Sequence, residues 1–330
     1  MKSKYNLMFF GSSNFSIYVL KSLLKKYKVD LIVTLPAKPA GRKLKLELNI
    51  VTKFALKEKI PFFELTDWTT FKNYLNSFDL DKWLGIIAGF GKIIPPEIIK
   101  LFTNGILNVH PSLLPKYRGP NPIREVILNN EEKTGITIIF IDELVDHGPI
   151  IKQKSYYLTG DETYETLEEK LGLLGGKLLS EVITDLSTLT KEEIEKLKKD
   201  NKQNDKVATY TRRITKEDGH LTLKDDYDTW QRKIRALNPW PSTFIYINLR
   251  GSKKILKIFS IEKLNKNEIP KDFEKIKIGQ FFQFRNKLGL RLKDAFILIN
   301  WLQLQDRKKM NSSEFLNGYH LSDFYLENSY

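Results

Sequence analysis

Two residues that could act on a substrate lie close together after a short apolar segment at 105–109. Asn108 and His110 alternate with apolar neighbours, so a strand here would place both side chains on one face. The segment that follows, 111–122, is rich in proline and glycine, which predicts a tightly shaped loop. An amide donor and an imidazole would then point into one crevice. The alternative is that Asn108 satisfies loop backbone and His110 is a packed edge histidine.

A candidate carboxylate lies further along the chain, in segment 134–151. This segment is predicted to form a strand, an acidic turn and a second strand, with Asp146 two residues before Gly148. A carboxylate on such a turn could pair with a histidine from the neighbouring strand and hold its tautomer. Asp142 and Glu143 are less favoured candidates. The alternative is a plain hairpin turn in which Asp and Gly serve only backbone geometry.

The composition argues against several other chemistries. The chain has no cysteine, which excludes thiolate zinc sites, cysteine nucleophiles and disulfide scaffolds. Its histidines are scattered and match no two-histidine zinc motif on one helix. A metal site is therefore not expected.

The segments that must position these residues alternate between strand and helix patterns. This alternation predicts a doubly wound α/β domain with a mostly parallel sheet over 1–189. Ligands of such sheets bind at the carboxyl ends of strands, where both polar segments lie. The predicted strands are 5–10, 29–34, 83–88, 105–109 and 135–142, and the predicted helices are 15–26, 49–59, 122–129 and 163–189.

A domain boundary is expected after the last of these helices. Segment 190–206 is so polar that it is predicted to be a linker with at most one solvent-exposed helix turn. Beyond it, in 207–330, short strands at 244–247, 254–259, 289–292 and 296–302 are spaced as in a small OB-like β-barrel.

The charge is strongly positive and unevenly distributed. The net charge is +14, and residues 207–330 hold 23 basic against 14 acidic side chains. Such a surplus is typical of proteins with a polyanionic partner such as nucleic acid or membrane. A second basic run, Lys38, Arg42, Lys43 and Lys45, lies in a predicted loop at 36–46. The alternative for both is a solvated lysine-rich surface.

The first apolar segment, 5–10, is too short for a signal peptide or a membrane-spanning helix. No longer apolar run follows it. The protein is therefore expected to be soluble, and the lack of cysteine favours the cytoplasm. A monomer is expected as well.

Together, the two polar segments resemble the formyltransferases that use 10-formyltetrahydrofolate. The family pattern has Asn-x-His before Ser-Leu-Leu-Pro-x-x-Arg-Gly, then Thr-Gly-(Val/Ile)-Thr and an Asp-x-x-x-Asp-x-Gly turn. The residues that match it are Asn108, His110, 112–115, Arg118, Gly119, 134–137, Asp142, Asp146 and Gly148. Upstream, 88–95 resembles the family segment that lines the pterin pocket.

Within this family the chain most closely resembles the methionyl-tRNA formyltransferases, over nearly its whole length. Segment 39–45 resembles the basic loop by which those enzymes hold the tRNA acceptor end, and 234–241 resembles their Arg-Ala-Phe-Asn-Pro-Trp-Pro signature. Segment 302–318 resembles their C-terminal end. Relatives that act on purine precursors or sugar nucleotides lack this combination.

The resemblance implies a reaction and a set of site residues. The reaction is transfer of a formyl group from 10-formyltetrahydrofolate, the formyl-donor co-substrate, to the α-amine of methionine on initiator methionyl-tRNA, for translation initiation. The amine itself attacks, so neither a metal nor a nucleophilic side chain is needed. The implied catalytic residues are Asn108, His110 and Asp146; the folate-binding residues are Phe90, Gly91, Ser112, Leu113, Leu114, Pro115 and Asp142; the tRNA-binding residues are Lys38, Arg42, Lys43, Lys45 and Arg118.

Three other functions stay open at this point. The first is formyl transfer to a small amine, such as an amino sugar nucleotide or glycinamide ribonucleotide. The second is an RNA-binding protein without catalysis, and the third is a hydrolase that releases formate from the same folate. The chain also departs from many family members at His147, where they have threonine.

Overall fold

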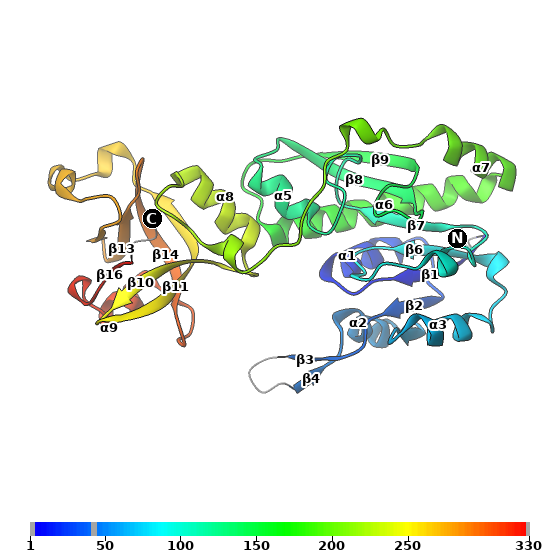
Figure 1. Cartoon of the computed structure of the whole chain (residues 1–330), viewed down its shortest axis with the longest axis horizontal. Coiled ribbons are helices and arrows are strands. Elements are labelled where there is room, and N and C mark those ends of the chain that lie inside the picture. Colours follow the sequence, from blue (N-terminus) through cyan, green and yellow to red (C-terminus); the bar gives the residue numbers. More distant parts are fainter. Residues whose placement is uncertain (1–3, 41–44, 328–330) are drawn as a thin grey trace. The chain divides into compact units, whose positions relative to one another are not determined.

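The computed structural model describes residues 4–40 and 45–327, which form two compact units (Figure 1). The first unit holds residues up to 123, 131–160 and 165–212. The second holds 124–130, 161–164 and the chain from 213 onward. The domain boundaries expected from the sequence, at 189/190 and 206/207, stay predictions.

The first unit is built on a seven-stranded sheet, which confirms the predicted α/β class. Its first five strands are parallel, and the last two pairings, β7 with β8 and β8 with β9, are antiparallel. In spatial order the strands are β5 (Phe62–Glu64), β2 (Leu31–Thr34), β1 (Asn6–Phe10), β6 (Trp83–Ile87), β7 (Ile106–His110), β8 (Lys133–Phe140) and β9 (Ile150–Tyr157).

Helices of this unit begin where side chains satisfy the free backbone N–H groups of the first turn. Ser13 caps α1 in a reciprocal capping box, and Asn49 and Asp67 cap α2 and α3. The helices of this unit are α1 (Asn14–Leu23), α2 (Ile50–Glu58), α3 (Trp68–Leu75), α4 (Pro96–Ile99), α6 (Tyr164–Thr188) and α7 (Lys191–Asp200). Most of α5 (Pro122–Leu128) belongs to the second unit. The short strand β5 and helix α3 were not predicted, because the aromatic run 62–74 shows no clean period.

Helix α7 differs from the single turn expected at 190–206. It runs for ten residues, since Thr190 and Glu193 form a capping box and Ile194 is buried. One apolar anchor and a good cap thus hold a helix that its polar composition alone did not predict.

Different side chains cover the two faces of the sheet. On one face, the rings of Phe10, Phe71 and Phe90 meet edge to face in an aromatic core under α3 and α4. On the other, glycines of α6 allow close packing: a Cβ on Gly175 would lie 2.7 Å from Val109 Cγ1. Val109 therefore points to α6, and its strand neighbours point to the opposite face.

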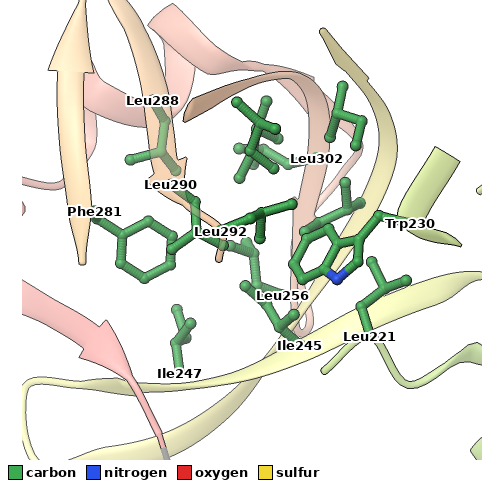
Figure 2. Close-up of a cluster of buried hydrophobic side chains, with 14 of the residues drawn as sticks. Leu221, Trp230, Ile245, Ile247, Leu256, Phe281, Leu288, Leu290, Leu292 and Leu302 are labelled. Atoms are coloured by element: carbon green, nitrogen blue, oxygen red, sulfur yellow. The ribbon is translucent and has the colours of Figure 1, made fainter. Parts of the chain in front are cut away.

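The second unit is an antiparallel sheet consistent with the predicted OB-like half-barrel. Figure 2 shows its core, where the fully buried Trp230 of α8 (Tyr227–Leu237) lies among aliphatic side chains of the strands. In spatial order the strands are β12 (Phe281–Phe284), β13 (Lys287–Arg291), β14 (Phe296–Leu304), β11 (Ser252–Lys263), β10 (Thr243–Leu249) and β16 (Phe324–Leu326), with β15 (Met310–Asn311) beside β14 and α9 at Ser312–Gly318.

The predicted basic loop is a hairpin between β2 and α2. Its strands are β3 (Lys38–Ala40) and β4 (Lys45–Glu47), which pair antiparallel and extend away from the main sheet (Figure 1). Over the described ranges 4–40 and 45–327, no helix is both long and apolar enough to cross a membrane.

We expect Gly176→Val to lower the free energy of unfolding by about 3 kcal/mol, because its added atoms would overlap the Val19 carbonyl oxygen and Ser22 of α1. Urea unfolding followed by circular dichroism measures the change. Lys177→Val is the matched control, since Lys177 is exposed on the same helix. Equal stability of the two variants would contradict the close approach of α1 and α6.

Candidate active site

Strand β7 ends at the polar residues singled out from the sequence. Asn108 pairs with Ile139 and His110 with Thr137 of β8, and both side chains lie on the face opposite Val109. His110 is buried and Asn108 is half-buried. The strand thus presents an amide and an imidazole side by side at the carboxyl end of a central strand.

The Asp146 carboxylate joins these two residues. Its Oδ1 accepts a hydrogen bond from Asn108 Nδ2 at 2.9 Å and lies 3.5 Å from His110 Nδ1. Its Oδ2 accepts from the backbone N–H of Gly119 at 2.8 Å. The carboxylate therefore links the end of β7, the turn after β8 and the loop after His110.

The hydrogen bonds of His110 define where its protons lie. Its Nε2 is 2.9 Å from the Tyr117 carbonyl oxygen, which only accepts, so Nε2 carries a hydrogen. Its Nδ1 faces Asp146 Oδ1. The distance between these two atoms is 3.5 Å.

The backbone of Asp146 takes a conformation that few residue types tolerate. Its φ is +52°, in the left-handed region where Asp is one of the more tolerant residues. Two residues later, any side chain at Gly148 would overlap the Phe140 carbonyl. The side chain of Gln203 donates to the carbonyl oxygens of Asp146 at 2.9 Å and Gly148 at 2.8 Å.

The loop at 112–115 is held from β8 and β9. Thr137 Oγ1 donates to the Ser112 carbonyl at 2.7 Å and accepts from the Leu114 N–H at 3.1 Å. Gln153 Nε2 donates to the Leu114 carbonyl at 2.8 Å and to Thr137 Oγ1 at 2.9 Å. Ser112 and Leu114 are buried, whereas Leu113 and Pro115 are half-buried. These four hydrogen bonds thus fix the position of the loop that follows His110.

In segment 88–91, the ring of Phe90 and the backbone make different contacts. The Phe90 ring is buried in the aromatic core, so its side chain serves packing. Gly91 has a φ of +77°, which glycine adopts readily. Ser12 Oγ donates to the Phe90 carbonyl at 2.6 Å and fixes this turn against the end of β1.

Asp142 and His147 form a pair at the outer side of the same turn. Asp142 Oδ2 lies 2.6 Å from His147 Nδ1, and its Oδ1 accepts from the Leu144 N–H at 2.9 Å. His147 Nε2 also lies 3.5 Å from Asp205 Oδ2. His147, which departs from the family pattern, therefore connects the turn to the segment after α7.

Arg118 is buried, with 1% of its surface exposed, and binds protein groups. Its Nε and Nη2 donate to Gln203 Oε1 at 3.0 and 2.9 Å, Nη2 donates to Asp205 at 2.8 Å, and Nη1 donates to Tyr210 Oη at 3.1 Å. The Arg118 hydrogen bond, helped by the charge of His147, lowers the pKa of Asp205. This contact therefore persists at neutral pH and weakens only in acid, as the carboxylate takes up a proton.

The structure describes the other basic residues that are predicted to bind tRNA to different extents. Lys38 is exposed at the start of β3. Lys45 begins β4, and its side chain is outside the description. Arg42 and Lys43 lie outside the described residues. Direct contact of these four residues and Arg118 with RNA stays a prediction.

Three residues of the site were not singled out from the sequence. Tyr117, Gln153 and Gln203 each act through one amide or carbonyl group, and a single polar residue in a loop or strand carries no sequence signal. Within the described part of the chain, no group of three or more His, Cys, Asp or Glu side chains could hold a metal ion. The side chains that meet at the end of β7 supply an amide, an imidazole and a carboxylate.

Two protein-family models match the chain. The family described as "Formyl transferase" matches residues 5–183, and "Formyl transferase, C-terminal domain" matches residues 213–320. The first match contains Asn108, His110 and Asp146.

Curated relatives cover nearly the whole chain. A methionyl-tRNA formyltransferase of Caldanaerobacter subterraneus subsp. tengcongensis is 32% identical over 96% of this chain and 98% of its own length. A methionyl-tRNA formyltransferase of Buchnera aphidicola subsp. Baizongia pistaciae is 33% identical over 94% of this chain and 93% of its own.

Solved structures share the fold at lower identity. An N-formyltransferase of Helicobacter canadensis, in complex with folinic acid and dTDP-3-aminofucose, aligns with a TM-score of 0.57 and 20% identity over 89% of this chain and 98% of its own. HypX of Aquifex aeolicus, in complex with tetrahydrofolic acid, aligns with a TM-score of 0.57 and 15% identity over 99% of this chain and 51% of its own.

We expect Arg118→Lys to speed tryptic cleavage after Lys202 and Lys206 by about tenfold. A lysine cannot replace the forked contacts that hold this segment, and a charge-assisted hydrogen bond contributes about 1.5–3 kcal/mol. Mass spectrometry of timed digests at neutral pH measures the rates. Lys116→Ala, at an exposed neighbour, is the control. Unchanged cleavage would show that Arg118 does not hold the segment.

Proposed function

Since the chain belongs to the methionyl-tRNA formyltransferase family, we propose that it transfers a formyl group from 10-formyltetrahydrofolate to the α-amine of methionine on initiator methionyl-tRNA, for translation initiation. The observation that carries this proposal is the meeting of Asn108, His110 and Asp146 at the end of β7. A match over almost the full length of both chains adds the second unit to the argument.

The proposed reaction passes through a tetrahedral carbon that bears a negative oxygen. Such a step is accelerated by donors aimed at that oxygen in a preorganised site. Asn108 Nδ2 carries two hydrogens, and the Asp146 carboxylate accepts one of them. We assign the other to the formyl oxygen, and the bond to Asp146 holds the amide in place for it.

The proton of the attacking amine must leave, and the folate nitrogen must gain one. The carbon–nitrogen bond to the methionine amine forms first and gives the tetrahedral carbon, and the collapse of that carbon then breaks the bond to the folate nitrogen. We assign the uptake of the amine proton to Asp146, directly or through water, and delivery to the folate nitrogen to His110. Asp146 Oδ1 and His110 Nδ1 lie 3.5 Å apart, so the two groups that are assigned these proton transfers are neighbours.

The proposed folate-binding residues are Phe90, Gly91, Asp142 and the loop Ser112, Leu113, Leu114 and Pro115. Buried Phe90 would act through its backbone, and the rigid 112–115 loop would form a wall of the pocket. Asp142 would act while paired with His147. The family supports a folate-derived formyl donor, and its 10-formyl form is part of this proposal.

The proposed tRNA contacts are electrostatic. Exposed Lys38, with Arg42, Lys43 and Lys45 of the same loop, would hold the acceptor end, and the basic second unit would contact RNA by backbone charge and shape. Buried Arg118 would act indirectly, by ordering residues 203–210. We further propose that the protein acts as a monomer in the cytoplasm, where initiator tRNA is used.

A transfer assay with purified protein tests the function. Formyl transfer should occur with charged initiator tRNA, with charged elongator tRNA used much less. Glycinamide ribonucleotide and amino sugar nucleotides are the controls for the alternative, because relatives of that fold include sugar N-formyltransferases. Preferred use of a small amine would overturn the proposal.

We expect Asn108→Ala, His110→Ala and Asp146→Ala each to lower kcat by at least about two orders of magnitude, because each is assigned to the transition state. Combined variants should lose much less than the product of the single losses. Single-turnover kinetics on charged tRNA measure this, with circular dichroism as the check on folding. A well-folded His110→Ala protein with wild-type turnover would refute the mechanism.

We expect Arg42→Ala to raise KM for charged tRNA and to flatten its salt dependence. A side chain that contacts a phosphate contributes about 0.7–0.9 to the log–log salt slope, which its loss removes. Titrations of KM against salt measure the slope, and KM for the folate should not change. Lys53→Ala, at an exposed lysine of α2, is the control. Identical slopes would assign the loop to ordinary solvated surface.

A further inference from the structure

The amide of Gln203 connects the catalytic turn to a buried arginine. Its Nε2 donates to the carbonyl oxygens of Asp146 at 2.9 Å and Gly148 at 2.8 Å. Its Oε1 accepts from Arg118 Nε at 3.0 Å and Nη2 at 2.9 Å. A glutamine amide can donate two hydrogen bonds and accept two, and Gln203 makes all four.

The orientation of this amide follows from its partners. Arg118 only donates, so it must face the oxygen of the amide, and the two carbonyls only accept, so they must face the nitrogen. Arg118 is itself buried and also bound to Asp205 and Tyr210. Gln203 therefore links the Asp146 turn to an arginine whose position is fixed by other contacts.

The turn needs such an anchor because of the backbone of Asp146. Its left-handed φ of +52° is disfavoured for a residue with a side chain, and neighbouring contacts must maintain it. This conformation aims the carboxylate at Asn108 and at the Gly119 N–H. A change in that backbone would move both carboxylate oxygens.

We propose that Gln203 is a positioning residue for the formyl transfer: its amide holds the Asp146 turn in the conformation that aims the carboxylate at Asn108 and His110. This inference rests on the proposed function. It assigns a catalytic-site role to the segment after α7, outside both family matches, which cover 5–183 and 213–320.

The Gln203→Glu variant distinguishes two roles for this residue. Gln203 could position the Asp146 turn, or it could only attach the segment after α7 to Arg118. A carboxylate of nearly the same shape keeps two acceptors for Arg118 and adds opposite charge, so the segment stays attached. It has no hydrogen to donate, and it places an oxygen against the two carbonyl oxygens of Asp146 and Gly148. Attachment alone therefore predicts wild-type behaviour for this variant, whereas positioning predicts a loss.

For Q203E in the full chain we expect kcat on charged initiator tRNA to fall at least about tenfold, since small misplacements of a catalytic group cost up to about 10²-fold. KM for tRNA and for the folate should change far less. Lys202→Ala, at the exposed preceding residue, should match the wild type. If Q203E fails to fold, Gln203→Met should show the same split between kcat and KM, because it removes the donors and the acceptor without adding charge, and Asp205 and Tyr210 still bind Arg118.

Hydrogen exchange supplies a readout that does not depend on activity. The Gly119 N–H donates to Asp146, so its exchange should be faster in Q203E. The Thr211 N–H donates to the Arg118 carbonyl at 2.7 Å, so its exchange should stay as slow as in the wild type. Wild-type kcat and unchanged Gly119 exchange in Q203E would overturn the inference. Absence of formyl transfer by the wild type would instead overturn the proposed function, and the exchange at Gly119 would still decide whether Gln203 orders the turn.

Discussion

The structure depends most on one constraint: the Asp146 carboxylate must reach two donors that lie on different segments. Its oxygens accept from Asn108 on β7 and from the Gly119 N–H in the following loop, and its backbone takes a left-handed φ to do so. The antiparallel pairing of β7 with β8 brings the turn back over the strand end. Sheet topology and turn geometry thus meet in the residue to which the proposed mechanism assigns proton uptake.

Support for this arrangement comes from a wider ring of hydrogen bonds. Thr137 and Gln153 hold the 112–115 loop from one side, and Gln203 and Arg118 hold the turn and the following segment from the other. In the proposed reaction, these contacts would hold the donors in their orientation before substrate binds, which is the condition under which such donors accelerate acyl transfer. The proposed catalytic residues would then depend on neighbours that do not touch substrate.

Much of the fold was predictable because local pattern and global structure agree. Most strands of the central sheet were found from short apolar runs, and α1 and α2 from their helical patterns. The aromatic run at 62–74 was not assigned, since β5 and α3 are recognisable only from the core that their rings join. Helix α7 was underestimated because one buried residue, Ile194, stabilises an otherwise polar segment.

The sequence alone determined the α/β class and the placement of Asn108 and His110 on one strand face, because these follow from residue types at short spacings. The reaction was implied by the resemblance of its motifs to a known family. Only the tertiary structure decided the partners. It placed Tyr117 opposite His110, turned Arg118 inward, and brought Gln203 to Asp146 across 57 positions of chain. Contacts of that separation depend on how loops close over the sheet, and a single glutamine in a polar segment gives no local sign of them.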